Sequence, residues 1–141
     1  MLRIYTDGAC SQNGSWKGGW GFVVLDENNE IVLKKNGAED ATTNSRMEIL
    51  AVVEALKSVD AKEITIVSDS AYVCNTLNEW LDSWLNKGIL NTKAHADLWR
   101  EIVGLRTGRV VIAEHIRGHN GDYFNEIADR LATGAIKGRL V

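Results

Sequence analysis

Proline is absent from this chain of 141 residues, and no low-complexity tract, internal repeat or linker divides it. A single domain covering residues 1–141 is therefore the simplest organisation, and its length is sufficient to bury a core. No apolar run reaches membrane-spanning length. The first residues also lack the basic start, apolar centre and small-residue cleavage site of a secretory signal. We expect a cytoplasmic protein with no membrane association.

Cysteine is scarce, since the chain has only Cys10 and Cys74. Their surroundings are typical of a turn and a helix, and a reducing compartment disfavours a disulfide between them. Neither has another Cys or a His at zinc-ligand spacing. Both are expected to be free thiols.

An excess of positive charge is also missing: the formal net charge is −3 at pH 7. On its own this argues weakly against a nucleic-acid binder. Residues 80–117, however, hold six basic and four acidic side chains, a local balance of +2. No Gly-x-Gly-x-x-Gly or Lys-Ser/Thr phosphate loop follows a strand, which argues against a nucleotide-binding domain.

The hydrophobic pattern predicts three short strands, over residues 1–9, 19–26 and 30–39, with a hairpin turn at Asn28-Asn29. A helix over 42–60 follows, then a β-branched strand over 63–69. Helical patterns cover 70–88, with a break expected near 77–80, and 94–107. The last strand spans 109–118, and Asp122 is placed to cap a helix over 122–136. This order predicts an α/β protein, a mixed sheet with helices on its faces.

Two aspartates come at strand ends. Asp7 follows Ile4-Tyr5-Thr6 near the end of the first predicted strand, and Asp69 ends the fourth. If these strands are parallel neighbours, both carboxylates lie at the sheet edge where α/β proteins bind ligands. Turn chemistry is the simpler explanation for each alone, because Asp-Gly is a common turn pair and Asp69 or Ser70 could cap a helix.

Two further acids lie on predicted helices. Glu48 shares a helix face with alanine and valine, where an unpaired carboxylate is costly, so we expect a cation beside it. A capping box from Ser45 to Glu48 would also explain it. Asp129 lies between Ala128 and Leu131, where a surface acid paired with a neighbouring base is equally plausible.

The four acids together suggest more than any one of them. Hard divalent cations such as Mg²⁺ prefer carboxylate oxygen and retained water. Two such ions about 3.5–4 Å apart can activate a water and stabilise the leaving oxygen of a phosphodiester. The set therefore has the chemistry of a two-metal nuclease.

Several stretches, in order and at matching spacing, resemble the type 1 ribonuclease H family. They are YTDGAC with its glycine-rich hairpin, TTNSRMEILAVVEAL, IVSDSAYV, EWLDSWLNKG followed by DLWREI, and IRGHNGDYFNEIADRLA. Any one motif would be weak, but the collection is specific and covers nearly the whole chain. The resemblance implies a ribonuclease H-like five-stranded mixed sheet, three antiparallel strands and then two parallel ones, flanked by helices on both faces.

The resemblance also implies an endonuclease that cleaves the RNA strand of RNA–DNA hybrids with two Mg²⁺ ions, leaving 3′-hydroxyl and 5′-phosphate ends. Mn²⁺ is a possible substitute. Asp7 would bridge both ions, and Glu48, Asp69 and Asp129 would complete the ligand set. His119 matches a loop histidine that assists proton transfer or product release, with a solvated loop histidine as the alternative.

A set of substrate contacts is implied as well. They are Gly8, Ala9, Cys10, Asn13, Thr43 and Asn44. Thr43 would hold a phosphate of the DNA strand, and the others would read 2′-hydroxyls of the RNA in the minor groove. Glycines in the hairpin leave room for a polynucleotide to approach Asp7.

The chain departs from the family pattern in three places. Its hairpin has Asn13-Gly14 without the usual proline, and Ala71 replaces a glutamine that commonly contacts substrate. The protrusion after the paired tryptophans holds only Lys87 and Lys93. We predict weaker and more salt-sensitive hybrid binding than in strongly basic relatives, tested by comparing KM at matched salt.

The tryptophans are predicted to pack inside the protein. Trp80, Trp84 and Trp99 are expected beneath the protrusion, with the alternative that one of them lies against the DNA backbone. Trp16 and Trp20 are expected to pack within the hairpin.

Two other functions compete with this one. A nuclease of the same fold with another substrate, such as a junction resolvase or transposase core, would not need the 2′-hydroxyl contacts at Asn13 and Asn44. A non-catalytic hybrid-binding module would have lost a carboxylate, and all four are present. We expect a monomer.

Overall fold

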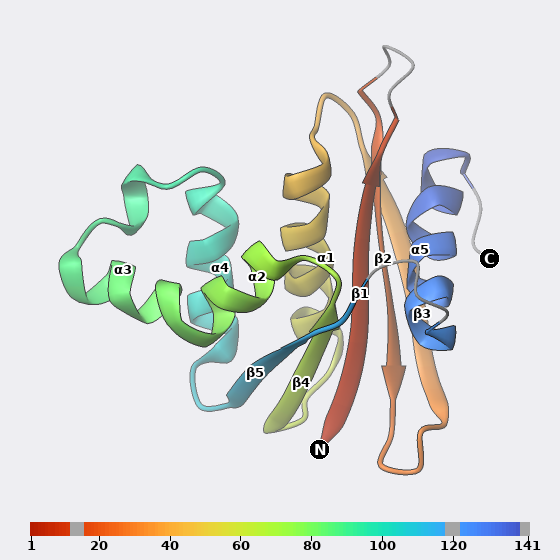
Figure 1. Ribbon diagram of the computed structural model, residues 1–141, viewed down its shortest axis with the longest axis horizontal. Helices are drawn as coiled ribbons and strands as arrows, with labels where there is room; N and C mark the ends of the chain where they lie inside the picture. The colour runs from red at the N-terminus through yellow and green to blue at the C-terminus, as the bar shows by residue number, and fades with distance from the viewer. Residues whose placement is uncertain (12–15, 118–121, 139–141) are drawn as a thin grey trace.

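The computed structural model describes residues 1–11, 16–117 and 122–138 (Figure 1). Its centre is a five-stranded sheet in the order β3-β2-β1-β4-β5. The strands are β1 (Leu2–Cys10), β2 (Gly18–Leu25), β3 (Ile31–Glu39), β4 (Glu63–Ser68) and β5 (Val110–His115). β1, β2 and β3 pair antiparallel, whereas β4 is parallel to β1 and β5 is parallel to β4. The predicted sheet is confirmed.

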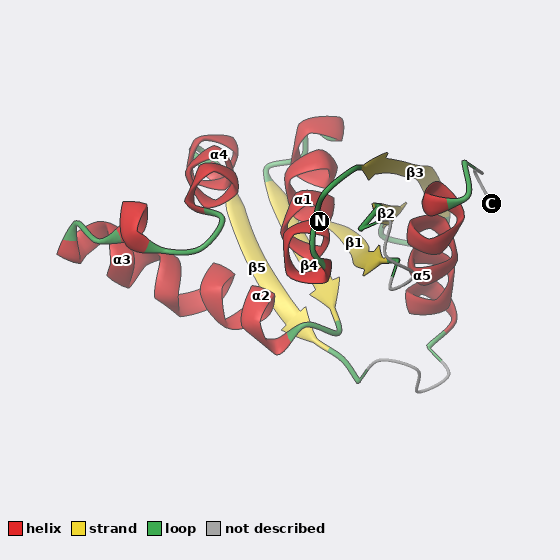
Figure 2. Ribbon diagram, turned by 90° about the horizontal axis from the view of Figure 1, so that it is seen from above, coloured by secondary structure: helices red, strands yellow, loops and turns green. Residues whose placement is uncertain are grey.

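Alternating side chains give the sheet two buried faces. Ile4 of β1 belongs to the core cluster beneath helix α1 (Asn44–Ser58), while its neighbour Tyr5 belongs to a second cluster with Ala128. Ala128 lies on helix α5 (Tyr123–Ile136). Figure 2 shows α1 and α5 on opposite sides of the sheet, so β1 and β2, which contact both helices, are covered on both faces.

Helix α1 starts where a threonine caps it. Thr43 has extended backbone and its Oγ1 accepts the main-chain N–H of Arg46 at 3.2 Å. Ser45 lies inside the helix, so the alternative of a capping box from Ser45 to Glu48 is wrong. Helix α4 (Ala96–Arg106) packs against α1 on the same side of the sheet.

The segment between β4 and α4 extends away from the sheet as a helical protrusion (Figure 1). It consists of α2 (Ala71–Asn75), η1 (Thr76–Trp80), α3 (Leu81–Lys87) and a short turn, η2 (Leu90–Thr92). The break expected near 77–80 is instead a change of winding, because η1 is a π-helical turn that joins α2 to α3 without interruption.

The tryptophans of the protrusion differ in burial. Trp99 is fully buried and Trp84 packs edge-on against it, with ring centroids 6.4 Å apart. Trp80 is 39% exposed, so its prediction as core was wrong. In the hairpin, Trp20 stacks on Phe22 as expected, whereas Trp16 is 61% exposed and does not pack inside.

Asn78 occupies the π-helical turn and protects the edge of the sheet. Its side chain donates to the main-chain oxygen of Ala113 at 2.9 Å and accepts the Ala113 N–H at 2.8 Å. Because β5 is an edge strand, Asn78 satisfies groups that another strand would otherwise pair with.

Smaller predictions are also confirmed. Asn29 adopts the left-handed conformation in the turn between β2 and β3, and Asp122 accepts the N–H groups of Phe124 and Asn125 as the cap of α5. Both cysteines are free thiols. Among the described residues, no helix is long and apolar enough to cross a membrane.

Candidate active site

Asp7 and Asp69 lie at the same edge of the sheet because of the strand register. Tyr5 of β1 pairs with Val67 of parallel β4, and each aspartate follows two residues later. Asp7 is 7% exposed, and one of its oxygens accepts the Gly8 N–H at 2.9 Å. The juxtaposition expected from the two strand ends is therefore present.

The other two acids come from opposite faces of the sheet, Glu48 from α1 and Asp129 from α5. All four carboxylates line one cavity of about 240 Å³, which we call the carboxylate groove. Its lining residues are Asp7, Gly8, Ala9, Cys10, Asn44, Glu48, Asp69 and Asp129. Five predicted metal or substrate residues besides Asp7, Asp69 and Glu48 thus meet in the same place.

The concentration of negative charge changes the acidity of Asp7. Burial is the main reason that the pKa of Asp7 rises to about 8, and the charge of Asp69 is the second. The Gly8 N–H opposes the rise, while Asp129 and Glu48 add to it. The groove therefore gathers acids, and no positively charged side chain of the described residues acts on Asp7 to keep it readily ionised.

One carboxylate oxygen of Glu48 has a hydrogen-bond partner among the described residues, and the other has none. Asn44 Nδ2 donates to its Oε1 at 2.9 Å, whereas Oε2 is buried and forms no hydrogen bond with the described residues. Burial raises the pKa of Glu48, the Ser70 hydroxyl lowers it and Asp69 raises it further. The cation expected beside Glu48 is not a side chain of the described residues, since Glu48 takes part in none of their salt bridges.

This donor set suits a hard divalent cation. Such an ion would bind the carboxylate oxygens, give the buried and unpartnered oxygen of Glu48 a partner, and offset the repulsion among the acids. Across residues 1–11, 16–117 and 122–138, no three Asp, Glu, His or Cys side chains form a metal cage by themselves. Mg²⁺ commonly takes only one or two carboxylates, with water and substrate phosphate completing its shell.

A second hollow adjoins the carboxylate groove at Cys10 and Asn44, which line both. It measures about 340 Å³, and we call it the Trp16 groove. Its lining residues are Cys10, Ser11, Trp16, Thr43 and Asn44. The predicted phosphate-binding Thr43 therefore lies beside the predicted metal ligands, whereas Asn13 and His119 fall outside the described residues.

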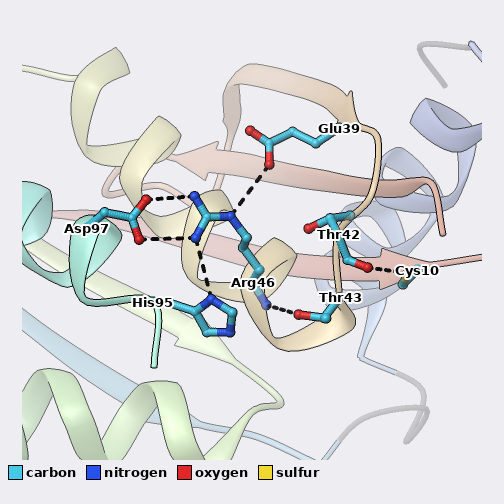
Figure 3. Close-up of polar contacts among 7 residues, drawn as sticks. All are labelled: Cys10, Glu39, Thr42, Thr43, Arg46, His95 and Asp97. Atoms are coloured by element: carbon cyan, nitrogen blue, oxygen red, sulfur yellow. Dashed lines mark hydrogen bonds and ion pairs between the residues drawn. The ribbon is translucent and has the colours of Figure 1, made fainter. Parts of the chain in front are cut away.

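Arg46 fixes the start of α1, which carries Thr43, Asn44 and Glu48. Its Nη1 and Nη2 atoms donate to the two oxygens of Asp97 at 3.1 and 2.7 Å, and its Nε lies 3.8 Å from Glu39 (Figure 3). The sequence analysis did not identify this network, because nothing local in the sequence relates residues 46 and 97.

His95 completes the network around Arg46, with its Nδ1 3.5 Å from Arg46 Nη1. Burial and the charge of Arg46 lower the pKa of His95, while Asp97 opposes them. A neutral His95 can accept from the guanidinium through Nδ1. Together these contacts join the N-terminal ends of α1 and α4.

Two other residues near the site were missed. Nε2 of His115, at the end of β5, lies 3.2 Å from the main-chain oxygen of Asp69. Trp16 lines the groove beside Thr43 and was expected inside the hairpin. A larger hollow of about 500 Å³, between α3 and α4 around Trp84 and Val103, contains no carboxylate and is remote from these groups.

Comparison with known proteins identifies the family. The family model described as RNase H matches residues 1–137. The chain belongs to the RNase H family.

Individual relatives agree with this assignment. A Ribonuclease H of Syntrophomonas wolfei is 45% identical over an alignment of 145 positions, which covers 96% of each chain. LC9-RNase H1, a type 1 RNase H with the type 2 active-site motif, has a similar structure, with a TM-score of 0.82 and 29% identity over 97% of this chain and 72% of that one.

A third relative is part of a larger protein. The foamy viral protease–reverse transcriptase in complex with RNA/DNA hybrid aligns with a TM-score of 0.78 and 27% identity, over 98% of this chain and 20% of that one. The RNase H fold predicted from the sequence is therefore confirmed.

Proposed function

We propose that this chain, as one RNase H domain, is an endonuclease that hydrolyses the RNA strand of RNA–DNA hybrids and leaves 3′-hydroxyl and 5′-phosphate ends. The observation that carries the proposal is the meeting of four carboxylates from two strands and two helices in one groove. Membership of the RNase H family and the RNA/DNA hybrid bound by the foamy viral relative support the choice of substrate.

Asp7, Glu48, Asp69 and Asp129 are the proposed ligands for two Mg²⁺ ions, with Mn²⁺ as a substitute. The ions would supply an activated water and stabilise the developing charge on the phosphodiester and its leaving oxygen. The charges of the other three acids all act on Asp7, and its carboxylate is held by the Gly8 N–H, so it suits a ligand shared by both ions. Asn44 orients Glu48 through its hydrogen bond to Oε1.

Recognition of the hybrid is assigned to the two adjoining grooves. The main chain of Gly8, Ala9 and Cys10 borders the carboxylates closely enough to meet the strand that is cut, and 2′-hydroxyl contacts are what distinguishes RNA from DNA. Asn44 lines both grooves, and Asn13 is proposed to join it in these contacts. Thr43 is proposed to hold a phosphate of the DNA strand.

His119 is proposed to assist proton transfer or product release. In the sequence it falls between β5 and α5, the elements that contribute His115 and Asp129 to the region of the carboxylates. We propose that the protein acts as a monomer, because one chain contributes all four carboxylates.

A substrate panel tests the proposal directly. Labelled RNA–DNA hybrid, RNA duplex, DNA duplex and single-stranded RNA are incubated with the protein and Mg²⁺, with chelator as the control. Cutting of the RNA strand in the hybrid alone, lost with chelator, is the expected result. Hybrid binding without cutting would identify a non-catalytic module, and cutting of DNA would identify a nuclease with another substrate; either would overturn the proposal.

A further inference from the structure

Trp16 exposes an unusually large apolar surface for a residue beside a polar groove. Its side chain is 61% exposed, and it lines the Trp16 groove with Thr43 and Asn44. Exposed apolar surface rimmed by polar groups is typical of an interaction site. Trp20, the other tryptophan of the hairpin, stacks on Phe22 and has a packing role instead.

The backbone holds Trp16 in place. Its main-chain oxygen accepts the Thr42 N–H at 3.0 Å, and the next residue, Lys17, accepts the Ser11 N–H at its main-chain oxygen at 2.8 Å. The φ angle of Trp16 is 53°, in a region that bulky residues seldom adopt. The indole is thus attached to a fixed point on the groove wall, which reduces the entropy lost when a ligand binds against it.

The position of the groove indicates what the indole meets. Because Cys10 and Asn44 line both grooves, a duplex seated over the carboxylates also passes the Trp16 groove. On the proposed function, on which this inference rests, Thr43 holds a phosphate of the DNA strand. Trp16 lines the same groove as Thr43, which puts the indole beside the residue assigned to that strand.

The chemistry of the strand selects the contact. Bases of a duplex are paired and stacked inside, so the strand offers its sugars and phosphates to the protein. A deoxyribose presents a methylene at C2′, whereas a ribose would place a hydroxyl against the indole without a hydrogen-bond partner, which is costly. We propose that the Trp16 indole packs on a deoxyribose next to the phosphate held by Thr43 and selects DNA at that position.

Kinetic variants give the first test. Trp16→Ala is expected to raise KM for the hybrid about five- to tenfold while kcat stays within about twofold, in keeping with aromatic contacts in other nucleic-acid complexes. Trp16→Phe keeps a flat ring and should restore most of the loss. Val110→Ala is the matched control, since Val110 is 56% exposed but lies at the start of β5, at the opposite end of that strand from His115.

A ribonucleotide scan of the DNA strand gives the second test. Hybrids with one ribonucleotide at each successive DNA position are bound to the Asp7→Asn protein, with and without Trp16→Ala. A ribonucleotide at one position of the DNA strand should weaken binding to the Asp7→Asn protein by about fivefold. The same substitution should have no effect on binding to the protein that also carries Trp16→Ala. An unchanged KM in Trp16→Ala, an equal rise in Val110→Ala, or the same scan profile with and without the indole would overturn the inference.

The two proposals fail in different ways. If the unaltered protein does not cut the hybrid, the proposed function is wrong. If it cuts the hybrid and the Trp16 variants behave like the control, only the deoxyribose contact is wrong. Thermal denaturation of each variant checks that the proteins whose KM values are compared are all folded.

Discussion

The main chain of Glu48 occupies the space in which a side chain at residue 8 would stand. An ideal Cβ on Gly8 would lie 2.5 Å from the carbonyl carbon of Met47 and 2.9 Å from Glu48 Cα, and closer still to Glu48 N. Strand β1 therefore touches the backbone of α1 at the point where Asp7 and Glu48 are carried. The close approach sets the spacing of the carboxylate groove.

Gly8→Ala is expected to lower both stability and activity. The new methyl group meets backbone that cannot rotate away, so β1 and α1 must separate, at a cost of about 1–3 kcal/mol in unfolding free energy. Urea denaturation and hybrid cleavage measure the two effects. Gly104→Ala is the matched control, because nothing lies within 4 Å of its Cβ and alanine favours a helix; equal behaviour of the two variants would contradict the account.

Asp7→Asn is expected to stabilise the metal-free protein at neutral pH. The pKa of Asp7 is raised to about 8, so the folded state binds this proton more tightly than the unfolded state, and stability falls as pH rises from about 4 to 8. Asparagine does not ionise, so the Asp7→Asn protein should not lose this stability as pH rises. Denaturation with chelator at pH 5 and pH 8 should show a gain of about 1–3 kcal/mol at pH 8 and less at pH 5.

Added Mg²⁺ should then stabilise the unaltered protein more than Asp7→Asn, because a bound ion favours the folded state. Asp60→Asn removes an exposed acid and serves as the control. A stability gain equal to that of Asp7→Asn in the control would show that net charge, and not the groove, is responsible.

Asp97→Asn tests the anchor of α1 and α4. The Arg46 guanidinium lowers the pKa of Asp97 to about 2. The ion pair therefore stabilises the fold at pH values above the ordinary pKa of an aspartate, and this stabilisation is lost as pH falls from about 4 toward 2. Asp97 is 54% exposed, which limits the expected loss at pH 7 to about 0.5–1 kcal/mol. Unfolding measured between pH 7 and pH 3 should show this difference shrinking toward acid; a difference independent of pH would contradict the assignment.

Thr43 is expected to have two separable roles. As the cap of α1 its hydroxyl accepts the Arg46 N–H, so Thr43→Ala should cost about 1 kcal/mol of stability. As the proposed phosphate ligand it should also raise KM for the hybrid. Thr43→Ser keeps the hydroxyl and should preserve both properties. If Thr43→Ala lowers stability but leaves KM unchanged, the phosphate role is wrong and only the cap remains.

The sheet and the juxtaposition of Asp7 with Asp69 could be predicted because both follow from local periodicity and strand order. The helical acids Glu48 and Asp129 were added by the joint pattern of acids and by the resemblance to the ribonuclease H family, because the position of each alone has a simpler explanation. Tertiary contacts determined what was missed. Threonine and serine flank the start of α1 alike, so the choice of Thr43 as cap was not visible. In the π-helical turn Asn78 pairs with Ala113, 35 positions away in the sequence. The main chain of the exposed Trp16 pairs with Thr42, which is likewise distant in the sequence.

Single-turnover cleavage of an RNA–DNA hybrid by Asp7→Asn, beside the unaltered protein in Mg²⁺, tests the central claim most directly. If Asp7 is a ligand shared by both metal ions, the rate constant of the Asp7→Asn protein should fall at least about a hundredfold. That fall is equivalent to several kcal/mol of transition-state stabilisation. Hybrid binding should persist. Cleavage of the RNA strand by Asp7→Asn at the rate of the unaltered protein would contradict the assignment of the carboxylate groove as the active site.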